Sequence, residues 1–185
     1  MKKILLLALT AVSVTSYAQD ALPTTKVTAI ENFQPESYLG KWYEIARIPF
    51  YFEEHCKAPI TANYALDGKN LTVTNSCATE DGKIDVAHGM GYFTESTPNI
   101  AKLEVTFVPA WLRFTHIGRG DYWVLYTDYQ YSLVGSPNHK YLWILSRNET
   151  IESACLDQLL AIAKEQGFDT TKLLFNYPKS ASPTN

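Results

Sequence analysis

Short runs of alternating apolar and polar residues, separated by turn signals, fill most of the chain between residues 30 and 150. Runs of about four to eight residues that are rich in aromatic and β-branched side chains are typical of half-buried strands. A strong hairpin signal, Asp67-Gly68, separates the second run from the third. The pattern predicts strands at residues 42–48, 60–66, 71–76, 86–93, 103–108, 122–127, 131–134 and 141–146.

One segment follows a helical period instead. Within residues 151–166 an apolar stripe, typical of an amphipathic helix, is formed by Cys155, Leu156, Leu159, Leu160 and Ala163. Gly167 suits the left-handed residue that ends a helix, and Phe168 could fold back onto the last turn. The apolar run at 173–175 predicts one further edge strand.

Eight strands with mostly short connections, followed by one helix, predict an all-β fold. The expected architecture is an eight-stranded antiparallel up-and-down barrel with one C-terminal α-helix packed outside it. A sandwich of two sheets and an outer-membrane barrel are the alternatives at this level. An outer-membrane barrel would need strands of about 9–11 residues with an outward apolar band, and the predicted strands are mostly shorter.

The N-terminus has the features of an export signal. Lys2 and Lys3 precede an apolar stretch at 4–14, and Ser16-Tyr17-Ala18 fits a small-x-small cleavage site. We therefore expect a signal peptide at residues 1–18, a flexible lead at 19–29, the folded domain at 30–178 and a disordered tail at 179–185. The exported protein is expected in the periplasm.

Composition excludes several function classes. Lys plus Arg number 16 and Asp plus Glu 19, a formal net charge of −3 without a basic run, so we expect no nucleic-acid partner. Aromatic residues make up 13% of the chain, which favours strands and ligand pockets. The four histidines show no metal-ligand spacing, and no phosphate loop or hydrolase motif is found. No metal or cofactor is therefore expected.

The three cysteines bear on both topology and location. Cys56 precedes the second predicted strand and Cys77 ends the third, so the hairpin register brings them nearly opposite each other. A bulge near Pro59 would absorb the remaining offset, and a Cys56–Cys77 disulfide is predicted because exported proteins are oxidised. Cys155, on the helix stripe, is expected to be a buried free thiol. No cysteine lies near the cleavage site, so no lipid anchor is expected.

Three short motifs follow one another along the chain and together carry a family resemblance. Residues 38–47, YLGKWYEIAR, resemble the G-x-W motif of the lipocalin family, in the long form of the bacterial outer-membrane lipocalins and the apolipoprotein D branch. Thr127-Asp128-Tyr129 is similar to the second motif, and residues 141–147 to the third, which ends in arginine. The resemblance implies a non-catalytic carrier in the bacterial cell envelope that binds, stores or transports a small hydrophobic ligand, most simply a fatty acid or lysophospholipid.

The family also leaves other functions open. One alternative is a carrier of a pigment such as haem or an isoprenoid, for which His116 in a predicted mouth loop would be a candidate axial ligand. Another is a lipocalin-like enzyme that uses a cavity cysteine. The predicted disulfide and the position of Cys155 outside the barrel argue against an enzyme.

The motif residues are expected to build the closed end of the barrel. Gly40 lets the chain bend into the first strand, Trp42 is large enough to plug the end, and the Arg147 guanidinium could stack on the Trp42 ring. The turn that joins the sixth and seventh strands lies at the same end. It contains Thr127, Asp128 and Tyr129.

Strand alternation and the apolar mouth loops give the candidate ligand site. Side chains that share a face with the motif residues, or that alternate cleanly, are expected to line the cavity. These are Glu44, Ala46, Val105, Phe107, Trp143 and Leu145. Apolar mouth loops predict a lid over the ligand or a peripheral contact with the outer membrane. Its candidate residues are Phe50, Tyr51, Phe52, Trp111 and Phe114. Both a monomer and a homodimer are compatible with this surface.

Overall fold

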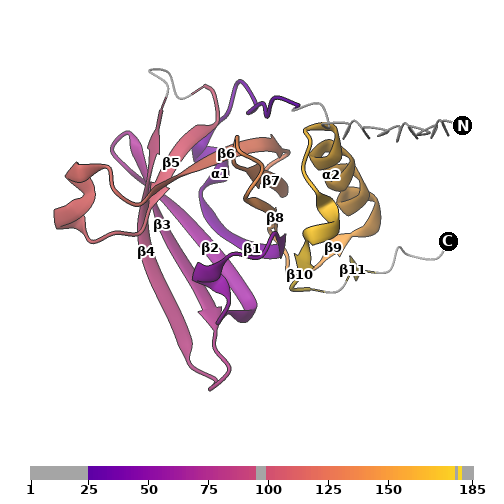
Figure 1. Cartoon of the computed structure of the whole chain (residues 1–185), viewed down its shortest axis with the longest axis horizontal. Coiled ribbons are helices and arrows are strands. Elements are labelled where there is room, and N and C mark those ends of the chain that lie inside the picture. The colour runs from indigo at the N-terminus through magenta and orange to yellow at the C-terminus, as the bar shows by residue number, and fades with distance from the viewer. Residues whose placement is uncertain (1–24, 95–98, 178, 181–185) are drawn as a thin grey trace, which may run out of the picture.

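A computed structural model describes residues 25–94, 99–177 and 179–180. The predicted signal peptide lies outside these residues. Eight antiparallel strands form a barrel, and α2 (Ser153–Glu165) packs against one side of it (Figure 1). The barrel strands are β1 (Gly40–Arg47), β2 (Lys57–Asp67), β3 (Asn70–Ala78), β4 (Ile84–Phe93), β5 (Lys102–Thr106), β6 (Arg119–Thr127), β7 (Tyr131–Gly135) and β8 (Leu142–Ser146).

The sheet closes because β1 pairs with both β2 and β8. A closed ring of strands confirms the predicted barrel and excludes the two-sheet sandwich. The pairing of β1 with β2 ends at Tyr43, and β10 (Leu174–Phe175) then takes the place beside β1, with Ala46 opposite Phe175. The additional edge strand predicted at 173–175 is therefore confirmed.

Two features of the β2–β3 hairpin set the position of the disulfide. Asp67 pairs with Asn70, so the turn consists of Gly68 and Lys69, one residue later than the Asp67-Gly68 turn that the sequence favours. Gly68 has a φ of +60°, which glycine adopts without strain. A register shift between Lys57 and Ile60 supplies the bulge expected near Pro59. The predicted Cys56–Cys77 disulfide is confirmed, with 5.4 Å between the Cα atoms.

The end of α2 follows the sequence prediction closely. Gly167 has a φ of +87°, its N–H donates to the Lys164 carbonyl, and the Phe168 N–H donates to the Ala163 carbonyl. This pair of bonds is the Schellman motif. The Phe168 ring packs into the barrel wall at Gly135, where an added Cβ would lie 2.6 Å from the ring. Gly135 therefore lets the C-terminal end of α2 pack closely against the barrel.

Two apolar cores stabilise the fold. The inner core fills the closed end of the barrel, around Phe33, Tyr38, Trp42, Tyr64, Val73, Ala101, Val124, Val134 and Leu145. The outer core joins the barrel wall to α2 and contains Val27, Ile45, Ala46, Ile48, Leu125, Leu133, Leu142, Ile144, Ile151, Leu156, Leu159, Ala163 and Phe168. Cys155 is a free thiol at the edge of the outer core, as predicted, although it is only partly buried.

The predicted boundaries of the folded domain need correction at both ends. Val27 and Ala29 are buried, so the expected flexible lead at 19–29 is wrong for these residues. At the other end β11 (Lys179–Ser180) pairs in parallel with β9 (Ile151–Glu152), so the expected disordered tail at 179–185 is wrong for these two residues, and residues 181–185 lie outside the described part of the chain. These additions extend the folded unit beyond residues 30–178.

Four short helical elements were not predicted. They are α1 (Pro35–Tyr38) and the 3-10 turns η1 (Tyr51–Glu53), η2 (Ala110–Thr115) and η3 (Thr170–Lys172). Each has six residues or fewer, too short for a helical period to be visible in the sequence. Within the described residues, neither α-helix is long and apolar enough to cross a bilayer.

Candidate ligand-binding cavity

The closed end of the barrel is built around Trp42. Its side chain is fully buried, and its indole N–H donates to the Tyr38 carbonyl at 2.8 Å. The Arg147 guanidinium lies 3.8 Å from the centre of the Trp42 ring, so the predicted stack is confirmed. Arg147 also donates to the backbone carbonyls of Ser37, Lys41 and Tyr129. One side chain thus fixes three segments of the chain around the plug.

Backbone geometry explains the remaining motif residues. Gly40 has a φ of +88°, which a residue with a side chain rarely adopts. The Asp128 carboxylate accepts hydrogen bonds from the N–H groups of Gln130 and Tyr131, and the Thr127 hydroxyl accepts one from Tyr129. These bonds fix the shape of the β6–β7 turn. The motif residues are therefore structural.

A cavity of about 320 Å³ opens at the opposite end of the barrel. Glu44, Phe50, Tyr51, Phe52, Glu53, Ile60, Thr61, Ala62, Tyr64, Val73, Asn75, Val105, Phe107, Gly118, Arg119, Gly120, Asp121, Tyr122, Tyr141, Trp143 and Leu145 line it. Of the six wall residues expected from strand alternation, Glu44, Val105, Phe107, Trp143 and Leu145 are among them. The wall is mainly apolar and aromatic.

Ala46 is the exception, and a β-bulge is the reason. The register between β1 and β8 shifts between Glu44 and Ala46, so strict alternation along β1 ends there. Ala46 belongs to the outer core, against α2, and the expectation that it lines the cavity is wrong. The same bulge brings Arg47 to the side of Glu44, where the two side chains form an ion pair at 2.8 Å.

Arg47 is the centre of a buried charged cluster in the cavity wall. Its Nη1 bonds to Glu44 Oε1 at 2.8 Å, its Nε lies 3.2 Å from Glu53 Oε2, and Asn176 bonds to both Glu44 and Arg47. Two carboxyl groups thus share one guanidinium. Burial, together with the neighbouring Glu44 charge, raises the pKa of Glu53 to about 8, and burial also raises the pKa of Glu44. The cluster therefore favours keeping a proton at neutral pH.

Three tyrosines form a polar floor between the cavity and the Trp42 plug. The hydroxyls of Tyr64 and Tyr122 lie 2.7 Å apart, and Tyr38 bonds to Tyr122 at 3.3 Å and to Ser132 at 3.0 Å. Burial raises the pKa of Tyr38 to about 12 and those of Tyr64 and Tyr122 well above the usual value. All three hydroxyls stay neutral, so the floor offers hydrogen bonds without charge.

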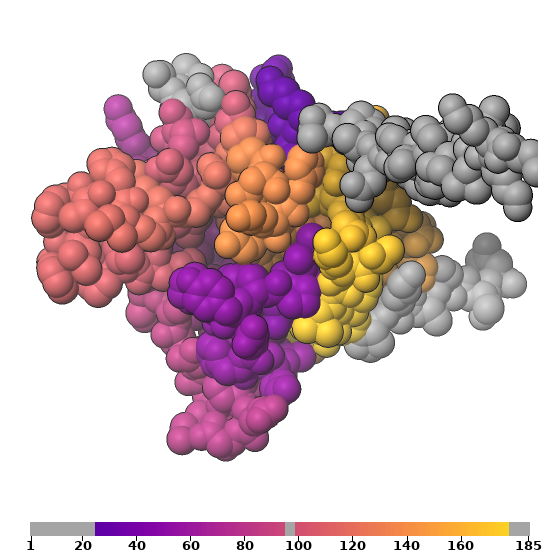
Figure 2. All heavy atoms as spheres, viewed as in Figure 1, coloured from indigo at the N-terminus to yellow at the C-terminus, as the bar shows by residue number. Residues whose placement is uncertain are grey.

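The two apolar mouth loops differ in their relation to the cavity. Phe50 packs edge-on against Trp143, with ring centres 5.6 Å apart, and Tyr51 and Phe52 also reach the cavity. Trp111 and Phe114, the other two residues expected in a lid, lie outside the lining residues and are exposed over 72% and 78% of their surface. Figure 2 shows their loop, in salmon, projecting from one side of the molecule. His116, the considered haem ligand, is exposed at the end of η2 and does not line the cavity.

Several polar residues of the site were not predicted, among them Arg47, Glu53, Asn75, Tyr64 and Tyr122. Tyr64 and Tyr122 fall on predicted strands, where strand alternation could have placed their side chains inside the barrel. The position of Arg47 depends on the bulge in β1, and that of Glu53 depends on the turn η1, so strand alternation alone predicts neither. The remaining signal was chemical, because a carboxylate inside a barrel requires a buried partner.

Comparison with known proteins gives the family. The lipocalin-like domain family matches residues 34–178. The chain belongs to the lipocalin family. It is 38% identical over 157 residues to the outer membrane lipoprotein Blc of Escherichia coli K12, covering 83% of this chain and 84% of that protein. It is 35% identical over 161 residues to temperature-induced lipocalin-1 of Arabidopsis thaliana (85% and 86%), and 38% identical over 157 residues to apolipoprotein D of Macaca fascicularis (77% and 76%).

Solved structures agree on the fold of this lipocalin. Lobster apocrustacyanin A1 superposes with a TM-score of 0.61 at 20% identity, over 88% of this chain and 96% of the other. Insecticyanin from the tobacco hornworm Manduca sexta gives a TM-score of 0.62 at 24% identity, over 85% of each chain. Membership of the family supports binding or transport of a small hydrophobic ligand.

Proposed function

We propose that this lipocalin binds, stores or transports a fatty acid or lysophospholipid without catalysis, in the bacterial cell envelope. The observation that carries the proposal is the cavity: about 320 Å³ with a mainly apolar wall, open at one end, and adjoined by a second hollow of about 340 Å³ that shares Phe50, Phe52 and Phe107. Such a continuous space suits an acyl chain, because each buried methylene contributes about 0.8 kcal/mol.

Polar atoms in the wall supply a place for a head group. Among the described residues, Asn75 Oδ1 is buried without a hydrogen-bond partner, and Glu53 Oε2 has an ion-pair contact with Arg47 Nε but no hydrogen bond. Both residues line the cavity, Glu53 on the mouth loop and Asn75 on β3. A glycerol hydroxyl or an amine of a lysophospholipid, or the protonated carboxyl of a fatty acid, would donate to these oxygens and relieve the cost of their burial.

The position of the cysteines supports a carrier over an enzyme. Cys56 and Cys77 are joined, and Cys155 lies on α2 outside the barrel, so no free thiol of the described residues faces the cavity. The buried carboxyls are held by Arg47 and Asn176. We therefore assign these groups to structure and to head-group contact.

A cavity-blocking variant tests the proposal. Ala62 lines the cavity from β2, and Ala65 is exposed three residues later on the same strand. Ala62→Trp should abolish co-purification of lipid in native mass spectrometry and reduce rebinding after delipidation. Ala65→Trp, the matched control, should bind as the wild type does. Equal lipid occupancy in a folded Ala62→Trp protein would contradict binding in this cavity.

We propose a periplasmic location with peripheral contact to the outer membrane. The Blc relatives are named outer membrane lipoproteins, and the Cys56–Cys77 disulfide suits an oxidising compartment such as the periplasm. Exposed aromatic side chains at the mouth, Trp111, Phe114, Tyr51 and Phe52, would mediate a reversible contact. Release from membranes by a carbonate wash is expected; retention until detergent is added would indicate a lipid anchor.

A further inference from the structure

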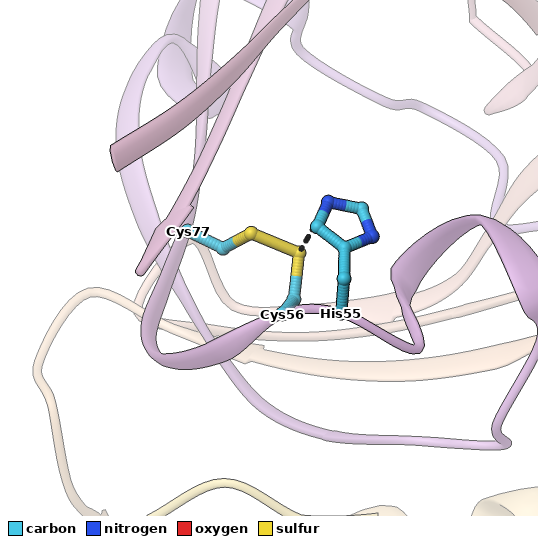
Figure 3. A group of neighbouring side chains, drawn as sticks. All are labelled: His55, Cys56 and Cys77. Atoms are coloured by element: carbon cyan, nitrogen blue, oxygen red, sulfur yellow. Dashed lines mark hydrogen bonds between the residues drawn. A yellow bond between two sulfur atoms is a disulfide. The ribbon is translucent and has the colours of Figure 1, made fainter. Parts of the chain in front are cut away.

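A cluster of metal-binding side chains lies at the rim of the barrel, beside the ligand cavity. One imidazole nitrogen of His55 and the sulfur atoms of Cys56 and Cys77 all lie within 4.8 Å of one another (Figure 3). The Cys56 sulfur is 3.9 Å from His55 Nε2. Asp85 Oδ2 is 2.8 Å from the same nitrogen, and Asp85 pairs with Cys77 across the β3–β4 ladder. Three donors therefore lie close together, and Asp85 approaches them from β4 through its contact with His55.

These four groups are a donor set for a thiophilic divalent cation. Two thiolates, an imidazole and a carboxylate form the tetrahedral environment that Zn²⁺ prefers, with ligand distances of about 2.0–2.3 Å. Donors around such an ion are about 3–4 Å apart. The spacing of His55 from Cys56 already lies in this range, and the His55–Asp85 spacing needs only a small increase.

The disulfide decides whether the donors are available. While Cys56 and Cys77 are bonded to each other, only the imidazole and the carboxylate remain, too few for a stable site. We propose that the reduced form of this protein binds Zn²⁺ through Cys56, Cys77, His55 and Asp85. The disulfide and the metal are then alternative cross-links between the mouth loop and the β3–β4 hairpin.

The chemistry balances with a phosphine as the reductant. A trialkylphosphine and one water molecule convert the disulfide into two thiols, and the phosphine leaves as its oxide after giving up two electrons. Binding of Zn²⁺ then forms two Zn–S bonds and releases the two thiol protons. The two thiolates and the Asp85 carboxylate together carry three negative charges, which attract the dication.

The surroundings allow entry of both reagents. The side chains of His55 and Asp85 are 49% and 53% exposed, so they can move to meet an ion. The disulfide lies in the wall of the second hollow, of about 340 Å³, which His55, Cys56, Cys77 and Asp85 all line. The same contacts would arise if His55 and Asp85 were only a surface ion pair beside a structural disulfide. Titration of the reduced protein with a metal ion separates that case from a metal site.

Cobalt is the probe, because its spectrum reports thiolate coordination. In a Cys155→Ser background the protein is reduced with a trialkylphosphine, freed of excess reagent under argon and titrated with Co²⁺. We expect one equivalent to bind with a near-ultraviolet thiolate-to-cobalt band and the intense visible bands of tetrahedral coordination, and Zn²⁺ to displace it. The oxidised protein should show neither band.

Variants assign the ligands. His55→Ala and Asp85→Asn should each weaken binding by at least about tenfold. His88→Ala, the matched control on β4, should leave it unchanged, because His88 contacts Thr74 instead. Zn²⁺ should also protect Cys56 and Cys77 of the reduced protein from alkylation, as read by peptide mapping.

Several results would overturn the site. They are an oxidised protein that binds Co²⁺ as tightly as the reduced one, a bound ion without the thiolate band, or full affinity in His55→Ala. Near-ultraviolet circular dichroism monitors folding throughout. Loss of the folded signal on reduction, without recovery on adding Co²⁺, would also refute the proposal.

Discussion

Replacing Trp42 by alanine tests whether this residue is the plug of the barrel. The side chain is fully buried, so its removal leaves a cavity in the inner core. Truncation of such a residue costs about 3–5 kcal/mol of unfolding free energy. The upper half of this range is expected, because the change also removes the ring on which Arg147 stacks at 3.8 Å, an interaction of about 1–2 kcal/mol when water is excluded.

Trp42→Phe is the matched variant. It keeps an aromatic ring beneath the guanidinium but loses the indole N–H, which leaves the Tyr38 carbonyl without its donor. We expect a smaller loss, about 1–3 kcal/mol. Urea unfolding followed by far-ultraviolet circular dichroism measures both, because that signal does not depend on the tryptophan removed. A loss below about 1 kcal/mol for Trp42→Ala, at unchanged m-value, would refute the role of Trp42 as a plug.

Three further predictions concern other parts of the structure. The unfolding free energy should fall as pH rises from about 5 to about 8.5. The folded-state pKa of Glu53 is about 8, above its usual 4.5, so the folded protein holds a proton that the unfolded chain has already lost, and this stabilisation disappears as Glu53 ionises. Glu53→Gln should flatten this slope; an equally steep slope in the variant would assign the effect to other groups. Gly135→Ala should lower the unfolding free energy in urea by about 1–3 kcal/mol, because the added Cβ would meet the Phe168 ring. Gly120→Ala is the control and should cost less, because the nearest atom to its added Cβ is 4.0 Å away. Equal losses in the two variants would contradict this packing. Peptide mapping without reductant should recover Cys155 unlinked, and a disulfide-linked Cys155 peptide would contradict its assignment as a free thiol.

Local patterns predicted most of the fold. Alternation located all eight barrel strands, and the spacing of apolar residues located α2 together with its Gly167–Phe168 end. The Trp42–Arg147 stack followed from closure, because the last strand of a closed barrel must lie beside the first. These features depend on periodicity and topology, which a single sequence records.

What escaped prediction depends on single-residue irregularities. One bulge in β1 turns Ala46 outward and brings Arg47 next to Glu44, and no residue type in this part of the sequence predicts the bulge. The β2–β3 turn moved by one residue because Gly68 supplies the positive φ equally well at the first turn position as at the second. Val27 belongs to the outer core, which only the folded barrel creates. Such features arise from tertiary packing rather than local preference.

The dependence of affinity on acyl-chain length tests the proposed lipid cavity most directly. Titration of the delipidated protein with saturated fatty acids of increasing length, followed by tryptophan fluorescence, should show tighter binding with each methylene, up to about fourfold per step, until the cavity is full. Trp143 lines the cavity, whereas Trp42 is in the plug, Trp111 is exposed and Trp123 packs against the outer core, so Trp143→Phe should lose most of the signal. Affinity that is indifferent to chain length would contradict the lipid assignment and favour a compact, ring-shaped ligand.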